Sequence, residues 1–253
     1  MPDSTQRFSN RVDSYVKYRP SYPSQAIDKL VSSCRITPAT TIAEIGSGTG
    51  ILTKLLLERG LSVQAIEPNR PMREAAERLL ASHFTFSSLN ATAESTGLPD
   101  SSVDLVVAAQ AFHWFDLDQT KTEFRRILKP GGYLALLWNE RLTDTTPFLR
   151  DYENLLTAHA TDYSAVNHAN ITDADIEAFF APAPVRKATF ENQQSFDYSG
   201  LEGRCLSSSY VPAPEHPSHA TFFRKLQELF ARHQRDGQVH FDYKTTLYTG
   251  LLG

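Results

Sequence analysis

The segment 41–50, TIAEIGSGTG, constrains the fold of this chain more than any other. An apolar run at 41–45 leads directly into glycines at positions 46, 48 and 50, and a helical pattern follows at 51–59. Glycine lets the backbone approach a ligand closely, and the next helix offers unpaired N–H groups and a positive dipole end. A strand before the glycines and a helix after them is the context that a nucleotide site requires. The segment predicts such a site, with a plain tight turn as the other reading.

Strand-like and helical patterns alternate along the rest of the chain. The apolar runs at 103–109 and 133–138 are typical of strands buried on both faces of a sheet, whereas those at 187–195 and 239–247 are polar and alternating, as antiparallel edge strands are. We predict an α/β, Rossmann-like fold with a seven-stranded, mostly parallel sheet, helices on both faces, an antiparallel C-terminal edge and a helical lid. Further strands are expected at 41–45, 61–66 and 84–87, and helices at 23–33, 51–59, 71–81, 117–128, 147–160, 173–180 and 216–234.

Composition and charge argue against several classes of partner. The net charge is −4, from 25 basic and 29 acidic residues, so the chain lacks the basic footprint of a nucleic-acid-binding protein. No apolar run approaches the ~18 residues of a membrane span, and residues 1–10 lack a signal-peptide core. We therefore expect a cytoplasmic protein without membrane association. Cys34 and Cys205 have no metal-ligand spacing and are expected to be free buried thiols.

Two carboxylates narrow the choice of ligand for the glycine loop. The dinucleotide fingerprint needs glycine or alanine where this chain has Ile51. Glu44, just before the loop, would repel a pyrophosphate but would receive an ammonium group. Glu67 closes the next strand, where a carboxylate can accept both ribose hydroxyls, although a solvent-facing side chain is the other reading. S-adenosylmethionine (SAM), which has an ammonium group and no phosphate, fits this pattern better than NAD.

Four motifs occur together between residues 44 and 132. They are the glycine loop with Glu44, the turn Glu67-Pro68-Asn69 followed by Met72, the pair Ala93-Glu94 followed by Leu98-Pro99-Asp100 and Asp104, and Arg126-Ile127-Leu128-Lys129-Pro130-Gly131-Gly132. Together they resemble the class I SAM-dependent methyltransferases, and among these the type 11 small-molecule branch, similar to trans-aconitate-methyltransferase-like and ubiquinone-biosynthesis-methyltransferase-like proteins. The resemblance covers 36–140, and the aromatic stretch 8–23 resembles the N-terminal lid of that branch.

The resemblance implies cofactor contacts for individual residues. Many relatives have an aspartate just before Ala93, where this chain has Thr92, so the adenine contact at 92 is expected to differ. The expected SAM-binding residues are Gly46, Ser47, Gly48 and Gly50 in the loop, Glu44 before it, Glu67 at the ribose, Pro68, Asn69, Met72, Ala93 and Glu94 around the adenine, and Gln110 facing the sulfonium and the acceptor.

The segment 109–115, AQAFHWF, follows a predicted central strand at the end where open α/β sheets bind ligands. His113 is either a general base or a buried structural histidine. Tyr15 is a second catalytic candidate. Arg19 either pairs with an acidic acceptor or lies on the surface. The expected acceptor contacts are Tyr18, Arg19, His113, Trp114 and Asn139.

The resemblance implies in-line SN2 transfer of a methyl group from SAM to O, N or C of a small-molecule acceptor, leaving S-adenosylhomocysteine, without a metal. A SAM-binding protein without transfer activity and an NAD(P)-dependent oxidoreductase are the alternatives, and the chain is expected to be a monomer or a homodimer. We expect a single SAM-methyltransferase domain, 1–253, with a lid and helix at 1–35, a SAM-binding core at 36–140, a helical insertion at 141–184 forming part of the acceptor pocket, and strands and a helix at 185–253 that complete the sheet.

Overall fold

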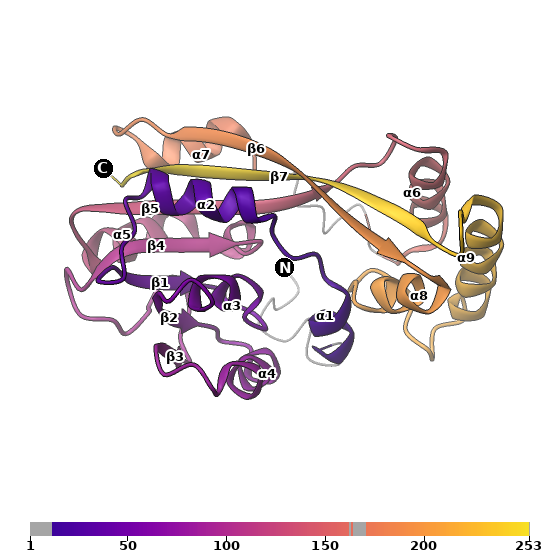
Figure 1. Ribbon diagram of the computed structural model, residues 1–253, viewed down its shortest axis with the longest axis horizontal. Helices are drawn as coiled ribbons and strands as arrows, with labels where there is room; N and C mark the ends of the chain where they lie inside the picture. Colours follow the sequence, from indigo (N-terminus) through magenta and orange to yellow (C-terminus); the bar gives the residue numbers. More distant parts are fainter. Residues whose placement is uncertain (1–11, 162, 164–170, 253) are drawn as a thin grey trace.

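A seven-stranded sheet organises the residues that the computed structural model describes, which are 12–161, 163 and 171–252. Its strands are β1 (Thr41–Ile45), β2 (Ser62–Ile66), β3 (Phe86–Leu89), β4 (Val103–Ala109), β5 (Leu128–Arg141), β6 (Arg186–Phe196) and β7 (Val239–Leu251). Their order is β3-β2-β1-β4-β5-β7-β6; β1 to β5 are parallel, and β7 is antiparallel to both β5 and β6 (Figure 1). The predicted Rossmann-like fold with an antiparallel C-terminal edge is confirmed.

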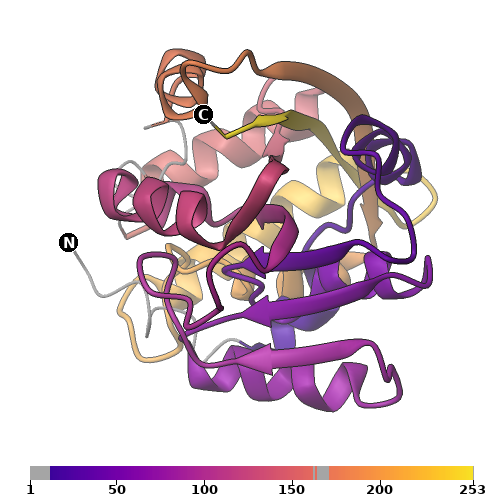
Figure 2. The same cartoon turned by 90° about the vertical axis from the view of Figure 1, so that its left-hand side faces the viewer.

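Successive side chains of the central strands bury both faces of the sheet. Val106 of β4 lies in a core cluster with Phe124 and Phe179, whereas the adjacent Leu105 lies in another with Leu52. Because helices cover both faces, the central strands are apolar throughout, which made them recognisable in the sequence (Figure 2). One face is covered by α5 (Leu117–Ile127) and α7 (Asp173–Phe180), and the other by α2 (Ser24–Ser33), α3 (Ile51–Leu57) and α4 (Arg70–Leu80).

A second group of helices packs around the carboxyl end of β6 and the amino end of β7 (Figure 1). It comprises α6 (Pro147–His159), α8 (Tyr198–Leu206) and α9 (His219–His233). Aromatic side chains form its core, with the rings of Tyr152 and Phe241 5.0 Å apart. The helix α1 (Val12–Tyr18) lies against α8. The arrowheads of β1 and β4 point toward this helical group in Figure 1, so it faces the carboxyl ends of the parallel strands.

The helix α8 is absent from the sequence prediction. It contains Gly200 and Gly203, and glycine is a poor helix former. Gly203 is required by packing, because a Cβ at this position would lie 2.0 Å from a ring carbon of Tyr18. Strand boundaries also differ: β3 begins at Phe86 rather than at 84, and β5 runs from 128 to 141 rather than from 133 to 138. The start of the predicted lid, 1–11 with Phe8, and residues 162 and 164–170 of the predicted insertion lie outside the described residues.

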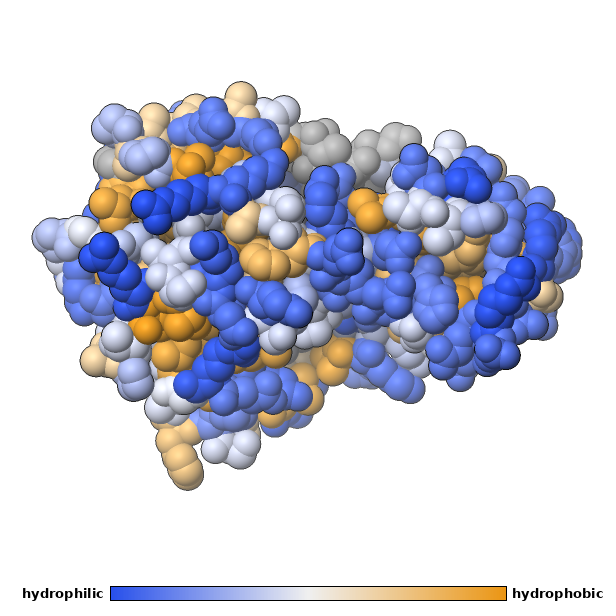
Figure 3. All heavy atoms as spheres, turned by 45° about the horizontal axis from the view of Figure 1, so that its top comes forward, coloured by the Kyte–Doolittle hydropathy of each residue, from blue (hydrophilic) through white to orange (hydrophobic). Residues whose placement is uncertain are grey.

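The described residues also show the character of the helices, of the surface and of the two cysteines. None of the helices in the described ranges is long and apolar enough to cross a membrane. On the face drawn in Figure 3, hydrophilic side chains predominate and apolar ones form small separate groups. Cys34 and Cys205 are both buried and free, as predicted.

Candidate functional site

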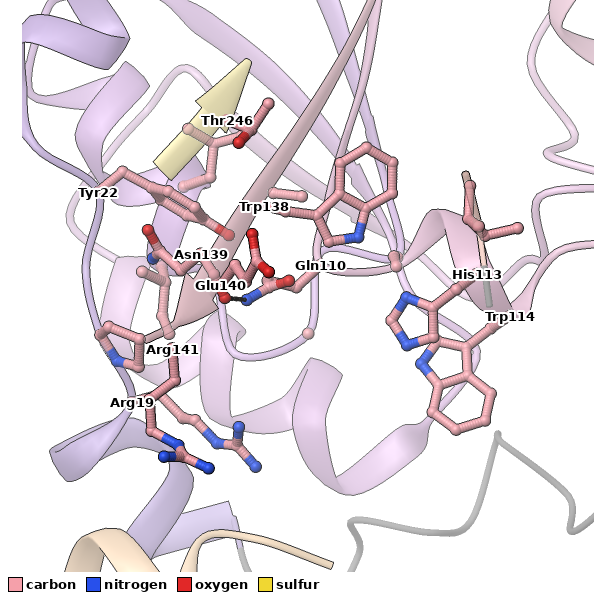
Figure 4. Close-up of a pocket in the computed structure, with 18 of the residues that line it drawn as sticks. Arg19, Tyr22, Gln110, His113, Trp114, Trp138, Asn139, Glu140, Arg141 and Thr246 are labelled. Atoms are coloured by element: carbon pink, nitrogen blue, oxygen red, sulfur yellow. Dashed lines mark hydrogen bonds between the residues drawn. The ribbon is translucent and has the colours of Figure 1, made fainter. Parts of the chain in front are cut away.

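A cavity of about 760 Å³ lies beyond the carboxyl ends of β1, β2, β4 and β5 and reaches the second group of helices. Its volume is typical of small-molecule sites. The strand order reverses between β1 and β4, and ligands of open α/β sheets bind at such a switch point. Figure 4 shows that side chains from the N-terminal segment, the end of β4 and the end of β5 surround this space.

Most of the predicted site residues line the cavity, but Gly50 and Tyr18 do not. Gly50 is the N-cap of α3, and a Cβ there would lie 2.8 Å from Cδ1 of Leu80. Tyr18 packs against Gly203 and the ring of Phe196 instead. Both residues therefore serve the packing of the walls. The predicted residues that line the cavity are Tyr15, Arg19, Glu44, Gly46, Ser47, Gly48, Glu67, Pro68, Asn69, Met72, Ala93, Glu94, Gln110, His113, Trp114 and Asn139.

The glycine loop is tied to the end of β2 through its backbone. The N–H groups of Gly46 and Ser47 both donate to the carbonyl of Ile66, at 2.8 and 3.1 Å. Gly46 has a φ of 69°, and a Cβ there would lie 2.5 Å from Cβ of Ala111, so this close approach requires glycine. A Cβ at Gly48 would meet nothing within 4 Å. The loop therefore presents bare backbone to the cavity.

Glu67 connects this loop to the turn after β2. Its Oε2 accepts the N–H of Gly48 at 2.8 Å, and its Oε1 accepts the N–H of Asn69 at 2.8 Å. The side chain is buried, and burial raises the pKa of its carboxyl while the two N–H donors partly offset that rise. Each carboxylate oxygen retains a lone pair, so the group can accept further hydroxyl donors from a ligand in the cavity.

Glu44 is the most deeply buried carboxyl of the cavity wall, with 1% of its surface exposed. Its Oε2 accepts the hydroxyl of Thr53 at 2.5 Å. Burial raises the pKa of Glu44 to about 8, an effect that the Thr53 hydroxyl opposes and the nearby Glu67 reinforces. A ligand cation beside Glu44 would lower this pKa again, so the residue suits an ammonium group.

The turn after β2 and the segment after β3 form another wall. Asn69 caps α4 by accepting the N–H of Met72 at 3.1 Å, which fixes the buried Met72 at the first turn of the helix. Ala93 is 4% exposed, and Glu94 accepts the backbone N–H of Asp116 at 3.0 Å. This wall therefore combines small or apolar side chains with polar side chains that hydrogen bonds hold in place. A flat ring of a ligand can pack against such a surface.

The segment after β4 bends sharply into the cavity. Gln110 has a φ of 57°, in the left-handed region that non-glycine residues seldom adopt, and its Nε2 donates to the carbonyl of Asn139 at 2.9 Å. The next residues form a 3-10 turn in which Phe112 is fully buried. His113 and Trp114 lie at the cavity with ring centroids 4.8 Å apart (Figure 4). Both predicted readings of His113, base and scaffold, are compatible with this position.

The side-chain amide of Asn139 joins three segments. Its Nδ2 donates to the carbonyl of Ser21 at 3.1 Å, and its Oδ1 accepts from Thr245 at 2.5 Å and from Asn192 at 3.2 Å. The amide is therefore committed to holding the N-terminal segment against β6 and β7, although Asn139 was predicted as an acceptor contact.

Several cavity residues were not identified from the sequence. Tyr22 is buried beside the cavity, and Arg141 closes β5 two residues after Asn139. Arg141 lies at the carboxyl end of a strand, where ligands bind in open α/β sheets, so its position in the sequence could have identified it. Arg204 and Tyr210 had no such signal, since they belong to and follow the unpredicted α8. Within the described ranges, no three His, Cys, Asp or Glu side chains are grouped so as to hold a metal ion.

Comparison with known proteins gives a consistent result. Residues 43–136 match a family model described as a methyltransferase domain. An uncharacterized methyltransferase of Mycobacterium tuberculosis is 41% identical over 139 residues, which cover 55% of this chain and 54% of that relative. The aligned part of the chain thus spans about half the length of this curated relative.

Two solved structures resemble the whole described fold. One, from Anaeromyxobacter dehalogenans, was reported as a candidate type II methyltransferase; it has a TM-score of 0.72 and 25% identity and covers 93% of this chain and 98% of its own. The other is a SAM-dependent methyltransferase from Thiobacillus denitrificans in complex with S-adenosyl-L-homocysteine. It has a TM-score of 0.56 and 17% identity over 96% of this chain and 97% of its own, a likeness of fold alone.

Proposed function

The chain belongs to the class I SAM-dependent methyltransferase family, and on this premise we propose that it transfers a methyl group from SAM to a small-molecule acceptor. The transfer is an in-line SN2 displacement onto O, N or C of the acceptor and leaves S-adenosylhomocysteine. The observation that carries the proposal is the hydrogen bond from Gly48 to Glu67, which joins a bare glycine backbone to a buried carboxylate at one cavity wall. The cytoplasmic location and the monomeric or homodimeric state remain predictions from the sequence.

The cavity residues fit SAM by the chemistry of their donors and acceptors. Glu44 and Glu67 supply carboxylates for an ammonium group and for ribose hydroxyls, respectively. The hydroxyl oxygen of Thr49 is buried at the cavity and has no hydrogen-bond partner in the described part of the chain, so a ligand group would satisfy it. Two carboxylates and no basic side chain in this loop oppose a pyrophosphate, which disfavours the NAD(P) alternative.

When bound, SAM supplies a methyl group on a sulfonium centre that needs no further activation. The residues of this chain would bind SAM and the acceptor, orient the two molecules and exclude water. Glu67 would hold the ribose, Met72 and Ala93 the adenine ring, and Gln110 would face the reacting end from its strained turn. Holding two reactants in line can supply most of the rate enhancement of such a reaction. The aromatic side chains of His113 and Trp114 would keep that end dry.

Tyr15 and His113 are the candidates for a proton-handling role. Both line the cavity, and the ring of Tyr15 lies 4.8 Å from the guanidinium of Arg19. An acceptor that is already ionised needs no base. In that case replacing His113 by asparagine changes the turnover less than about threefold, whereas a general base would account for about 100-fold or more.

The proposal is tested by incubating the protein with SAM labelled in its methyl group and with fractionated metabolite pools. Transfer of label to a small-molecule fraction, with stoichiometric S-adenosylhomocysteine, is expected. A Glu67→Gln variant should lose this transfer, and a Glu228→Gln variant, altered on the exposed face of α9, should keep it. SAM binding without transfer to any pool would identify a SAM-binding protein without this activity, and the absence of both would overturn the proposal.

A further inference from the structure

Three arginines gather at one end of the cavity. Arg141 ends β5, Arg204 belongs to α8, and Arg19 follows α1; all three line the cavity. The phenol of Tyr210 lies within electrostatic range of each of the three guanidinium groups, which places them in one cluster. In Figure 4 the guanidinium groups of Arg19 and Arg141 point the same way, on the opposite side of the view from His113.

This arginine cluster of Arg19, Arg141 and Arg204 has little negative charge beside it. Arg141 pairs with the carboxylate of Glu153. Within the described ranges, Arg19 and Arg204 form no ion pair with a carboxylate, although Arg204 is only 5% exposed. Arg19 beside it is partly buried. Burial of a charge is unfavourable unless it is paired, so these two guanidinium groups together indicate an anion that comes from outside the chain.

Hydrogen bonds hold these side chains in place and leave donors available. Nη2 of Arg19 donates to the carbonyl of Ser207 at 2.8 Å, and Nη1 of Arg204 donates to Oγ of Ser208 at 2.9 Å. Nε of Arg19 and Nη1 of Arg141 are buried without a hydrogen-bond partner in the part of the chain described. A guanidinium has five N–H donors, so the cluster is oriented but not saturated.

The effect of Arg204 on the pKa of Arg19 agrees with the placement of both side chains in one cluster. Burial and the neighbouring guanidinium of Arg204 lower the pKa of Arg19. An oxyanion between the two groups would reverse both effects, because it would replace the lost water and separate two like charges. The site is therefore organised for a negative group before that group arrives.

We propose that the methyl acceptor carries a small oxyanion, a carboxylate or a phosphate, that binds between Arg19 and Arg204 with Arg141 as a third donor. Guanidinium groups bind such planar or tetrahedral oxyanions through paired hydrogen bonds. The inference rests on the proposed function and specifies its acceptor class. The anion anchors the acceptor at this end of the cavity, and the methylated atom lies toward Gln110.

Calorimetry on the intact protein, saturated with S-adenosylhomocysteine, tests the anion site. Succinate, citrate and inorganic phosphate are the probes, and succinamide is the uncharged analogue of succinate. At least one anion should bind, and the uncharged analogue should not. Arg19→Gln and Arg204→Gln should each weaken anion binding about 10- to 100-fold, the range for losing hydrogen bonds to a charged group. Arg232→Gln, altered on the exposed side of α9, should bind anions as the wild type does.

The affinity for SAM, measured on every variant, separates the two proposals. An unchanged SAM affinity in Arg19→Gln and Arg204→Gln, together with lost anion binding, supports the inference. If Arg204→Gln does not fold, Arg204→Lys is measured in its place. Binding of phosphate alone would assign a phosphate, and binding of succinate or citrate alone a carboxylate. SAM binding together with no anion binding, or equal binding of succinamide, overturns the inference and leaves the proposed function intact. Absent SAM binding in the wild type contradicts the proposed function instead.

Discussion

The backbone N–H of Gly48 donates to Oε2 of Glu67 across 2.8 Å. This bond links the loop after β1 to the turn after β2, the two segments that the sequence singled out independently. Because the other carboxylate oxygen accepts the N–H of Asn69, one side chain fixes both walls of the candidate cofactor site. The site is thus organised by a residue that also offers its own lone pairs to the ligand.

Glu67→Gln is expected to weaken SAM binding about 10- to 100-fold. The amide has only one acceptor oxygen, so one of the two backbone N–H groups loses its partner and the ligand loses a charged acceptor. Titration calorimetry with SAM measures the effect. Glu228→Gln on the surface of α9 is the matched control, and equal affinity in both variants would remove Glu67 from the cofactor site.

Gly46→Ala should destabilise the protein by about 1–3 kcal/mol, the typical effect of overpacking. The new Cβ would overlap Cβ of Ala111 at 2.5 Å, and the φ of 69° adds strain. Urea unfolding measures the change. A second change, Ala111→Gly, should recover part of the loss by removing the overlap, whereas simple additivity of the two variants would show that the contact does not matter.

SAM affinity is expected to rise with pH between about 6 and 7.5. The pKa of Glu44 is about 8 in the folded protein, so a proton must leave before the carboxylate can pair with the ligand ammonium. The rise should approach tenfold per pH unit, and calorimetry in two buffers of different ionisation enthalpy should detect proton release. Glu44→Gln should abolish both signals, and an unchanged pH profile in this variant would assign the titration to another group.

The same residue gives a stability prediction of defined sign. Between the unfolded pKa of about 4.3 and the folded pKa of about 8, the native state binds more protons at Glu44 than the unfolded state does. The contribution of Glu44 to the free energy of unfolding therefore falls as the pH rises through this window. Urea unfolding at pH 5, 6.5 and 8 should show a smaller fall for Glu44→Gln than for the wild type, and parallel profiles would contradict the assignment.

Tyr18→Ala is expected to lower the stability by less than the ~3–5 kcal/mol that truncation of a fully buried aromatic costs, because Tyr18 is only partly buried. The ring packs against Gly203 and lies 6.4 Å from Phe196. Gly203→Ala in the wild type should also destabilise, because its Cβ would overlap the ring. In the Tyr18→Ala background the same change should be neutral or stabilising, and an equal loss in both backgrounds would refute the packing role.

Much of the fold could be predicted because it depends on local patterns. The central strands are buried on both faces and are therefore apolar throughout, as in 103–109. The glycine loop is equally local, since a strand, three glycines and a helix are contiguous in sequence. Sixteen of the predicted site residues line the cavity for a related reason: the carboxyl ends of parallel strands meet at one edge.

The remaining features depend on contacts between distant segments. α8 contains two glycines, and Gly203 is explained only by the ring of Tyr18, which is remote in sequence. The residues of the arginine cluster come from the N-terminal segment, β5 and α8, so no local sequence pattern predicts it. Asn139 was expected to contact the acceptor and lines the cavity, but its partners Ser21, Asn192 and Thr245 were not visible in the sequence.

A calorimetric titration of SAM into the wild-type protein, with NAD and NADP titrated in parallel, decides which ligand the cavity takes. SAM should bind at one site per chain and neither dinucleotide should bind, because Glu44 and Glu67 favour an ammonium group and ribose hydroxyls over a pyrophosphate. Binding of a dinucleotide in place of SAM, or no binding of SAM at all, would contradict the proposed cofactor.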